Sequence, residues 1–291
     1  MSTTNLVHNQ RAPQKHHRPR KARKHRRWSS PATILSLIVL AIAALWAIVP
    51  GIFAPHDPYN GVDVALLAPN GEYIFGTDAV GRDLFSRVVY GARQSLLGAL
   101  IAVAVGLVLG TLIGLIAGTR RGWVETVLMR LVDVLLAIPG ILLSLSIIIV
   151  TGFGSLQAAF AVGMTSVATF ARLARSQVIQ IANADFVEAA YGSGATQAQV
   201  LFRHVLPNSL TPVLALAALQ FGTAILQLSI LGFLGYGAPP PTPEWGLLIA
   251  EGRDFMATAW WLILLPGLAI VATVMSANHL SQVIQQEGDV K

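Results

Sequence analysis

Cysteine is absent from the 291-residue chain, and charged residues are scarce. The missing thiol excludes disulfides, thiolate metal sites and a cysteine nucleophile. Only 12% of the residues are charged and 54% are hydrophobic, whereas soluble domains carry roughly 25% charged residues. Because the apolar residues also gather in long runs, the composition predicts an integral membrane protein.

Sequence signals for catalysis are also missing. No G-x-x-x-x-G-K-[ST] segment occurs, so the chain has no phosphate-binding loop of its own. The sequence pairs no nucleophile with a base, and it places no carboxylate pair or metal-ligand spacing at one depth. We therefore predict that the chain is not an enzyme and that it holds no cofactor and no metal.

Six apolar runs have about the length needed to cross a bilayer as a helix, which is about 20 residues. They predict an all-α integral membrane protein with about six transmembrane helices. In the second run, Gly110, Gly114 and Gly118 lie four residues apart on one face, which favours close packing against another helix. The predicted spans are 32–53, 96–117, 127–150, 156–170, 210–233 and 260–279.

Positive charge is distributed unevenly along the chain. Residues 1–30 contain nine of the twenty Lys and Arg and no Asp or Glu, so we expect a disordered basic tail. With this tail in the cytoplasm, sixteen Lys and Arg lie inside and four lie outside, in agreement with the positive-inside rule. An even number of spans then places both termini inside. The tail lacks the interleaved aromatic residues of a single-strand binder, so no nucleic-acid partner is expected.

The segment at 54–94, between the first two spans, is predicted to lie outside. In this segment Asp78 is predicted to cap the helix that follows it. The pattern at 84–97 predicts an amphipathic helix along the membrane surface. Trp245, which follows a proline-rich stretch before the last span, is typical of the aromatic residues at a membrane interface.

The connection between the fourth and fifth spans is long and is predicted to be cytoplasmic. Long ordered connections are usually functional. We expect a first short helix that Asp185 caps and that Gly192 and Gly194 terminate. A second helix is capped by Thr196 and ends at Pro207, which breaks the helical pattern. A short helix displayed in this way is suited to dock into a groove of a partner protein.

This connection resembles the EAA loop of binding-protein-dependent ABC importers. The family pattern reads EAA, three residues, G, nine residues and I-x-L-P, and the chain has Glu188-Ala189-Ala190, Gly194 and His204-Val205-Leu206-Pro207. A histidine in place of the isoleucine, followed by Asn208, is similar to the peptide and nickel branch of the family. Phe75-Gly76-Thr77-Asp78 and the segment 133–139 are similar to that branch as well. The resemblance covers nearly the whole chain after residue 30.

The resemblance implies a permease subunit of an ATP-driven ABC importer in the bacterial inner membrane. It implies that separate ATPase subunits bind ATP and Mg²⁺ and contact the EAA loop. The contact residues would be Glu188, Ala189, Ala190, Tyr191, Gly192, Gly194, His204, Leu206 and Pro207.

The other implied partners are a second, homologous permease subunit and a secreted or lipid-anchored substrate-binding protein. The expected organisation is a basic tail at 1–30, a permease domain at 31–284 and a cytoplasmic tail at 285–291. The permease domain includes the outer loop 54–94 and the EAA loop 172–207. The cargo stays open among dipeptides, oligopeptides, nickel or metal chelates and glutathione-like peptides. The alternative function is an ion-gradient-driven transporter or a channel subunit.

Four polar residues within the spans are candidates for gating or for lining the path. Asp133 is an acid at membrane depth, which by default suggests function, but it can also pair with Arg130 three residues earlier. Gln220 and Gln227 can line a path or form hydrogen bonds between helices. The sequence leaves both alternatives open.

Overall fold

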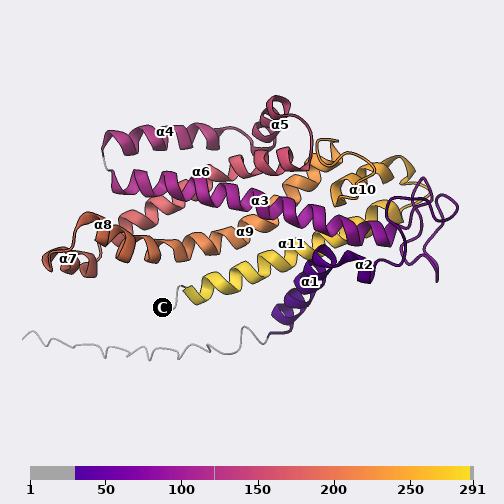
Figure 1. Cartoon of the computed structure of the whole chain (residues 1–291), viewed down its shortest axis with the longest axis horizontal. Helices are drawn as coiled ribbons and strands as arrows, with labels where there is room; N and C mark the ends of the chain where they lie inside the picture. Colours follow the sequence, from indigo (N-terminus) through magenta and orange to yellow (C-terminus); the bar gives the residue numbers. More distant parts are fainter. Residues whose placement is uncertain (1–29, 121, 289–291) are drawn as a thin grey trace, which may run out of the picture.

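The computed structural model describes residues 30–120 and 122–288 (Figure 1). The predicted basic tail, apart from Ser30, and residues 289–291 lie outside the described part. The described chain is helical and has no strand, with one isolated bridge between Thr77 and Asp83. The helices are α1 (Pro31–Ile48), α2 (Pro50–Phe53), α3 (Leu84–Thr119), α4 (Trp123–Ala137), α5 (Gly140–Thr151), α6 (Ser155–Ala182), α7 (Asp185–Gly192), α8 (Gln197–Val200), α9 (Leu206–Phe233), α10 (Trp245–Gly252) and α11 (Trp261–Gly288), with a π-helical segment at Leu201–Val205 and a 3-10 turn at Arg253–Phe255.

Four long helices, α3, α6, α9 and α11, run along the molecule (Figure 1). At one end, which we call the α7 end, α7 and α8 extend beyond the bundle. At the opposite end, which we call the α10 end, α10 and the long segment between α2 and α3 cover the bundle. The main core lies where α3, α6, α9, α10 and α11 meet, and it is composed mostly of alanine, valine and leucine with Phe170, Trp245 and Trp261.

The closest packing joins α3 to α6, and the glycines of α3 make it possible. A methyl group at Gly114 would lie 2.6 Å from the carbonyl oxygen of Ala171 and 2.6 Å from Cβ of Ala174. Gly110 and Gly118 lie equally close to α6, against Val167 and Val178 respectively. The predicted packing role of this glycine face is therefore confirmed.

Within residues 30–120 and 122–288, five helices are long and apolar enough to cross a membrane, and a bent pair brings the number to six if it counts as one span. The all-α fold class predicted from the sequence is confirmed. The predicted span 127–150 is not one continuous helix, because α4 and α5 meet at an angle of 98°. The predicted short span 156–170 is part of the 28-residue α6, which continues through Ala182. The first part of the predicted loop 172–207 is therefore a continuation of α6.

The prediction of a separate surface helix at 84–97 is wrong. Those residues form the first part of the continuous 36-residue α3, which is about 54 Å long at 1.5 Å per residue. The side chains of Leu84 and Val88 are buried against the protein, so this face packs on other helices rather than on lipid headgroups. Asp83, and not Asp78, caps α3, because the Asp83 carboxylate accepts hydrogen bonds from the N–H groups of Phe85 and Ser86.

The prediction that Pro207 ends a helix is also wrong. Residues 197–233 form one continuous span in which α8 passes through the π-helical segment into α9. The N–H of Leu206 donates to the carbonyl of Leu201, five residues earlier. Pro207 then lies in the first turn of α9. The missing proline N–H is tolerated there because the wider π turn has already displaced the ordinary hydrogen-bond pattern.

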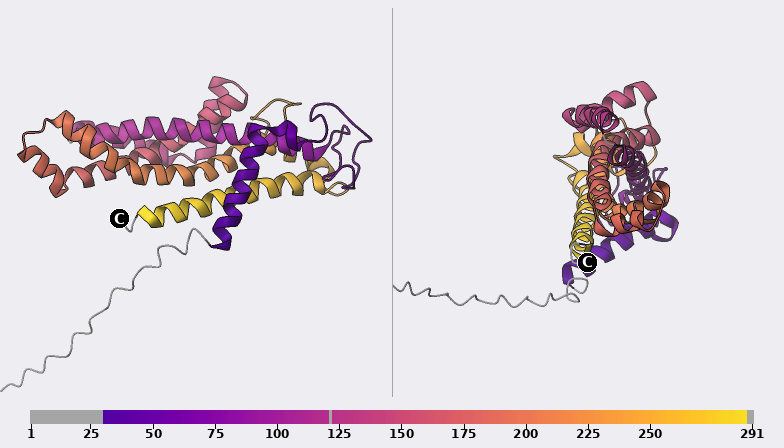
Figure 2. Two further views of the ribbon diagram at one scale, coloured as in Figure 1. Left: turned by 60° about the horizontal axis from the view of Figure 1, so that its bottom comes forward. Right: turned by 90° about the vertical axis from the view of Figure 1, so that its left-hand side faces the viewer.

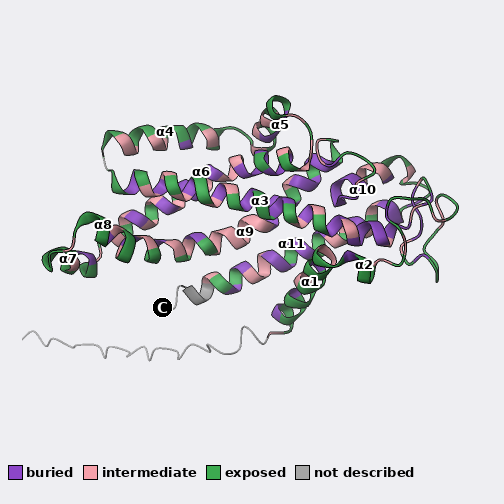
Figure 3. Cartoon of the chain, in the orientation of Figure 1, coloured by how far each residue is buried: buried purple, intermediate pink, exposed green. Residues whose placement is uncertain are grey.

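The peripheral helices expose most of their surface. In the turned views, α1 crosses α11 steeply (Figure 2), and it packs against α11 and α3. Exposed residues dominate α1, α4 and α5, whereas buried residues concentrate along α3, α6 and α10 (Figure 3). Exposed apolar side chains on long helices are expected where lipid or another membrane subunit provides the surroundings.

Candidate functional site

The EAA segment forms a projecting unit at the α7 end (Figure 1). Val187 on α7 is buried and packs with Val178, Val200 and Val205, so one face of the helix is anchored to the rest of the chain. The opposite face carries Glu188 and Ala189, which are exposed. The aromatic rings of Phe186 and Tyr191 are also about half exposed, at 46% and 48%. Large apolar rings beside carboxylates on a projecting helix are suited to a protein partner.

The turn after α7 follows the predicted glycine chemistry in part. Gly194 has a φ of +89°, the left-handed conformation that favours glycine. Gly192 instead lies inside the last turn of α7. Thr196 forms a capping box with Gln199, as the predicted second cap requires. Asp185 does not cap α7; Ala184 occupies the N-cap position and Asp185 is the first helical residue, where its charge still favours the helix dipole.

The end of the EAA pattern lies in and after the π-helical segment. The side-chain amide of Asn208 donates to the carbonyl of His204 at 2.6 Å, and the Ser209 hydroxyl donates to the carbonyl of Val205 at 2.7 Å. The His204 ring lies near the ring of Phe186 on α7, with a centroid separation of 6.4 Å. The unit therefore links α7, through the π segment, to the start of α9 at Leu206.

Two acid–arginine pairs tie α4 to α6 near the α7 end. Asp133 pairs with Arg172 at 2.7 Å, so the predicted pairing with Arg130 is wrong. Within the described residues Arg130 has no ion pair. Sequence reasoning missed the second pair, in which both Nε and Nη2 of Arg175 donate to the carboxylate of Glu125. The partners are far apart in the sequence, and only the packing of α4 on α6 brings them together.

Gln220 and Gln227, the two glutamines predicted to line a path or to bond between helices, lie on α9. Both Gln220 and Gln227 are half-buried. The side-chain oxygen of Gln227 is buried and accepts no hydrogen bond within the described chain. Gln227 faces the start of α5, since a methyl group at Gly140 would lie 3.7 Å from its Nε2. The structure does not bring either glutamine together with Asp133 through any hydrogen bond or ion pair among the described residues.

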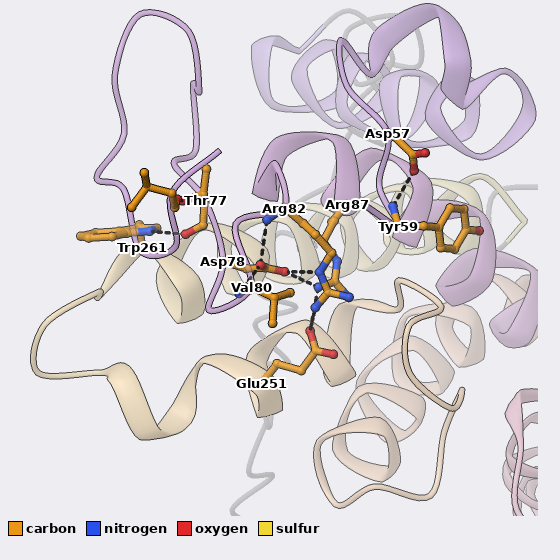
Figure 4. Close-up of polar contacts among 10 residues, drawn as sticks. Asp57, Tyr59, Thr77, Asp78, Val80, Arg82, Arg87, Glu251 and Trp261 are labelled. Atoms are coloured by element: carbon orange, nitrogen blue, oxygen red, sulfur yellow. Dashed lines mark hydrogen bonds and ion pairs between the residues drawn. The ribbon is translucent and has the colours of Figure 1, made fainter. Parts of the chain in front are cut away.

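A buried charge cluster at the α10 end was not predicted (Figure 4). The guanidinium of Arg87 is fully buried, and its Nη1 contacts carboxylate oxygens of Asp78 and Glu251, the latter at 2.9 Å. Arg82 joins the same two acids at 2.6 Å and 3.4 Å. The four charges balance, and they connect the loop before α3, α3 itself and α10. They border a cavity of about 230 Å³.

Two carboxyl groups at this end have shifted pKa values in opposite directions. Burial alone would raise the pKa of Asp78, but the N–H of Arg82, the charge of Arg87 and further donors hold it below its ordinary value. Burial raises the pKa of Glu244 to about 7, although the N–H groups of Gly246 and Leu247 and the hydroxyl of Ser95 oppose the shift. Hydrogen bonds thus stabilise the charged form of both groups, and at Asp78, where the charges of Arg87 and Arg82 add to them, burial is outweighed.

Glu244 and Trp245 anchor α10 inside the bundle. The Glu244 carboxylate caps α10 by accepting from the N–H groups of Gly246 and Leu247 at 2.9 and 3.0 Å. The indole of Trp245 is fully buried, and its N–H donates to the carbonyl of Val88 at 2.9 Å. The prediction that Trp245 lies at the membrane interface is therefore wrong; it is a core residue between α3 and α10.

Long apolar helices, one interrupted span and a helical unit projecting from one end are the architecture of a multi-span membrane transport subunit. Residues 110–286 match the family described as binding-protein-dependent transport system inner membrane component, and the chain belongs to this family. It is a permease subunit of an ABC importer, as the resemblance predicts, and its relatives are transport subunits rather than enzymes. The ion-gradient alternative is not favoured.

Relatives with assigned functions are similar over nearly the full chain. The dipeptide transport system permease protein DppC of Alkalihalophilus pseudofirmus is 40% identical over 89% of this chain and 83% of that protein. The probable D,D-dipeptide permease DdpC of Escherichia coli K12 is 36% identical over 90% and 88%. The glutathione permease GsiD of Escherichia coli O6:K15:H31 is 39% identical over 92% and 88%.

Solved structures of membrane transporters share the fold. The MetNI methionine ABC transporter in an inward-facing conformation aligns with a TM-score of 0.55 and 16% identity, over 68% of this chain and 96% of that chain. An amino acid ABC transporter solved with histidines aligns with a TM-score of 0.56 and 16% identity, over 69% and 94%. At this identity the likeness establishes the fold alone.

Proposed function

We propose that this permease subunit imports dipeptides or related short peptides. The observation that carries the proposal is that three relatives, similar over about nine-tenths of this chain, are named for dipeptide, D,D-dipeptide and glutathione transport. All three cargoes are small peptides with a free carboxylate. Asp78, which belongs to the motif on which the resemblance to the peptide branch depends, is buried in the outer segment and pairs with Arg82.

The cargo is tested with the substrate-binding protein that would deliver ligand to this permease. We expect titration calorimetry to detect binding of dipeptides or glutathione, and reconstituted vesicles to take up the same solutes when ATP is present. Nickel and metal chelates are the comparison ligands. Binding of a metal chelate without binding of any peptide would contradict the peptide assignment while leaving the importer class intact.

We propose further that α7 is the helix through which separate ABC ATPases drive transport. Glu188 and the half-exposed rings of Phe186 and Tyr191 form a surface that is suited to a cleft in a partner. The continuous helix from α8 to α9 joins this surface to a membrane span. A displacement of α7 would therefore move α9, which is one route by which ATP-dependent closure of the ATPases can change the exposure of the path.

Charge reversal at Glu188 tests the ATPase contact. Glu188→Arg places an unmatched charge in the contact, and we expect a loss of substrate-stimulated ATP hydrolysis of about tenfold, which corresponds to about 1.4 kcal/mol. Gln180→Arg, at an exposed position on α6, is the matched control and should hydrolyse ATP normally. The readouts are co-purification of the ATPase subunits and ATPase rate in reconstituted vesicles. Normal assembly and hydrolysis in both variants would contradict the role of α7.

This assignment places the α7 end and both termini in the cytoplasm, and the α10 end outside. The substrate-binding protein would then approach the segment between α2 and α3. A second permease subunit would complete the translocation path. Reporter fusions after Asn70 and Gly237 should indicate an outside location. Fusions after Gly194 and at Lys291 should indicate the cytoplasm. A fusion after Gly194 that reports outside would contradict both the topology and the ATPase contact.

A further inference from the structure

A groove of about 260 Å³ lies between α1 and α11 at the α10 end. There α1 crosses α11 steeply (Figure 2), and helices that cross steeply do not stay in contact along their whole length. Fully buried side chains of α3 and α10, Val88 and Trp245, lie behind the groove. Ile42 on α1 and Leu268 on α11 line it and are 42% and 52% exposed. The groove is therefore open to the surroundings of the two helices.

The lining of the groove offers almost no hydrogen-bonding groups. Of its twelve residues, only Thr273 and two tryptophans have polar side-chain atoms. The Thr273 hydroxyl donates to the carbonyl of Ala269 at 2.8 Å, and the Trp245 N–H donates to the carbonyl of Val88. Apolar cavities of this kind stay dry, because water inside them has too few polar partners. The chemistry of the groove therefore fits an apolar occupant.

The groove extends from the membrane interface toward the middle of the bilayer. Both α1 and α11 are long and apolar enough to cross a membrane. The lining runs from Val39 to Trp46 on α1 and from Leu265 to Thr273 on α11, which is about 10 to 12 Å at 1.5 Å per residue. Val39 lies halfway along α1, and Trp46 lies two residues before its end at Ile48. The space is thus elongated along the helices and borders lipid.

The dimensions of the groove fit a single acyl chain. A volume of about 260 Å³ over a length of about 11 Å corresponds to a mean cross-section of about 24 Å². A helix with its side chains is about 10–12 Å in diameter, so its cross-section of about 80 Å² or more does not enter. One side chain of a partner helix fits across the groove but fills only part of its length. A narrow apolar channel that borders lipid matches a hydrocarbon chain along its whole length.

Trp46 supplies a polar group at the interface end of the groove. Its ring packs edge-on against Phe85 with a centroid separation of 5.9 Å. Within residues 30–120 and 122–288 its indole N–H donates no hydrogen bond. A tryptophan at a membrane interface places its ring among the acyl chains and its N–H at the level of the headgroups. An ester carbonyl of a lipid whose chain occupies the groove is a suitable acceptor for this N–H.

We propose that the groove between α1 and α11 binds one acyl chain of a phospholipid from the leaflet on the α10 side. The inference goes beyond the proposed function and makes no assumption about the cargo. The chain fills the space that the crossing of α1 and α11 leaves, so it restores van der Waals contacts that the lining atoms otherwise lack. It thereby fastens the peripheral α1 to the bundle.

A photoreactive lipid tests the site. The complex with the partner permease and the ATPases is reconstituted in vesicles of phosphatidylcholine, a small fraction of which carries a diazirine in the half of one acyl chain nearer the headgroup. After irradiation, labelled residues of this chain are mapped by mass spectrometry of its peptides. We expect labelling of Ala269, which lines the groove and is half-buried. Leu45, exposed on α1 outside the groove, reports ordinary contact with the bilayer.

Matched variants of α11 separate a bound chain from ordinary surface lipid. Ala272 is exposed and lines the groove, so Ala272→Phe places a ring in the space of the chain. We expect labelling of Ala269 to fall about tenfold in this variant, because overpacking excludes the chain. The control is Val271→Phe, at the neighbouring exposed position, which does not line the groove. It should leave the labelling of Ala269 unchanged, and Leu45 should be labelled equally in all proteins.

Three results would overturn the inference. Equal labelling of Ala269 in Ala272→Phe and in the parent would show ordinary surface lipid alone. An equal decrease in Val271→Phe would show that the groove is not what the chain needs. Labelling of Leu45 without any labelling of Ala269 would indicate that the partner permease covers the groove. Leu268→Trp is a second blocking variant and should act like Ala272→Phe, since Leu268 is also exposed in the lining.

Uptake by the same vesicles tests the proposed function separately. Absence of ATP-dependent uptake by the parent complex would count against the proposed function, and the labelling would still decide the lipid site. Normal uptake together with labelling that Ala272→Phe does not reduce would remove the lipid site alone.

Discussion

Nη1 of Arg87 lies 2.9 Å from Oε2 of Glu251, and this contact ties α3 to α10 across 164 positions of the chain. Arg87 is fully buried, whereas Glu251 keeps about a quarter of its side-chain surface exposed. Asp78 binds the same nitrogen of Arg87, so a single guanidinium holds three segments together. Arg87 therefore connects the loop before α3, α3 itself and α10 at the α10 end.

Removal of the Arg87 guanidinium should destabilise the protein strongly. Arg87→Leu leaves Glu251 and Asp78 with Arg82 as their remaining partner, and loss of one partner from a buried pair costs about 3–5 kcal/mol. We expect a decrease of this order in the free energy of unfolding in detergent, followed by tryptophan fluorescence. Arg253→Leu is the matched control, because Arg253 is exposed and its only ion pair in the described part of the chain is with the neighbouring Asp254. Similar stability of the two variants would contradict the role of the cluster.

Glu244 should make stability depend on pH. Because burial raises its pKa from 4.5 to about 7, the folded protein binds the proton more tightly than the unfolded chain does. This contribution to the free energy of unfolding is fully present below pH 4.5 and is lost as the pH rises to about 7. Glu244→Gln keeps an acceptor for the N–H of Gly246 but does not titrate. We expect unfolding measurements between pH 4.5 and 8 to show a steeper decline for the parent than for this variant, and equal slopes would refute it.

The α3–α6 contact should not accept even a methyl group. Gly114→Ala brings Cβ to within 2.6 Å of the Ala171 carbonyl oxygen and the Ala174 Cβ, so the helices must move apart. Overpacking of this kind costs typically about 1–3 kcal/mol. The control is Gly267→Ala in α11, where nothing lies within 4 Å of the new Cβ. Thermal unfolding in detergent should separate the two, and equal unfolding temperatures would contradict the packing.

The two glycines after the EAA residues should respond oppositely to alanine. Both have open space, but only Gly194 has a positive φ. Gly194→Ala therefore costs about 1 kcal/mol of backbone strain, whereas Gly192→Ala favours the last turn of α7 by about 1 kcal/mol. Amide hydrogen exchange of α7 should become faster in the first variant and slower in the second. Faster exchange in both would show that the conformation of Gly194 is not what orders the turn.

The apolar runs and turn residues foretold much of the fold. They predicted the number of spans, the capping by Thr196 and the glycine face of α3, because each depends on neighbours in sequence or on a helical period. The apolar runs did not predict the bend between α4 and α5, because the whole of 127–150 has the length of one span. Pro139-Gly140 is a helix-breaking pair within 127–150, but the long apolar run led to the prediction of one span. The 98° angle between α4 and α5 depends on tertiary packing.

Local sequence properties and contacts between distant segments account for different features of this protein. The sequence alone determined that this is a membrane protein of several helices with a helical unit after the fourth span, because hydrophobic length and glycine spacing are local properties of the chain. Only the tertiary structure decided that Asp133 pairs with Arg172, that Trp245 is buried on Val88 and that Arg87 joins Glu251. Those pairs form between segments distant in sequence. Their partners depend on which helix faces pack together, and that choice is made by the summed packing of the whole bundle.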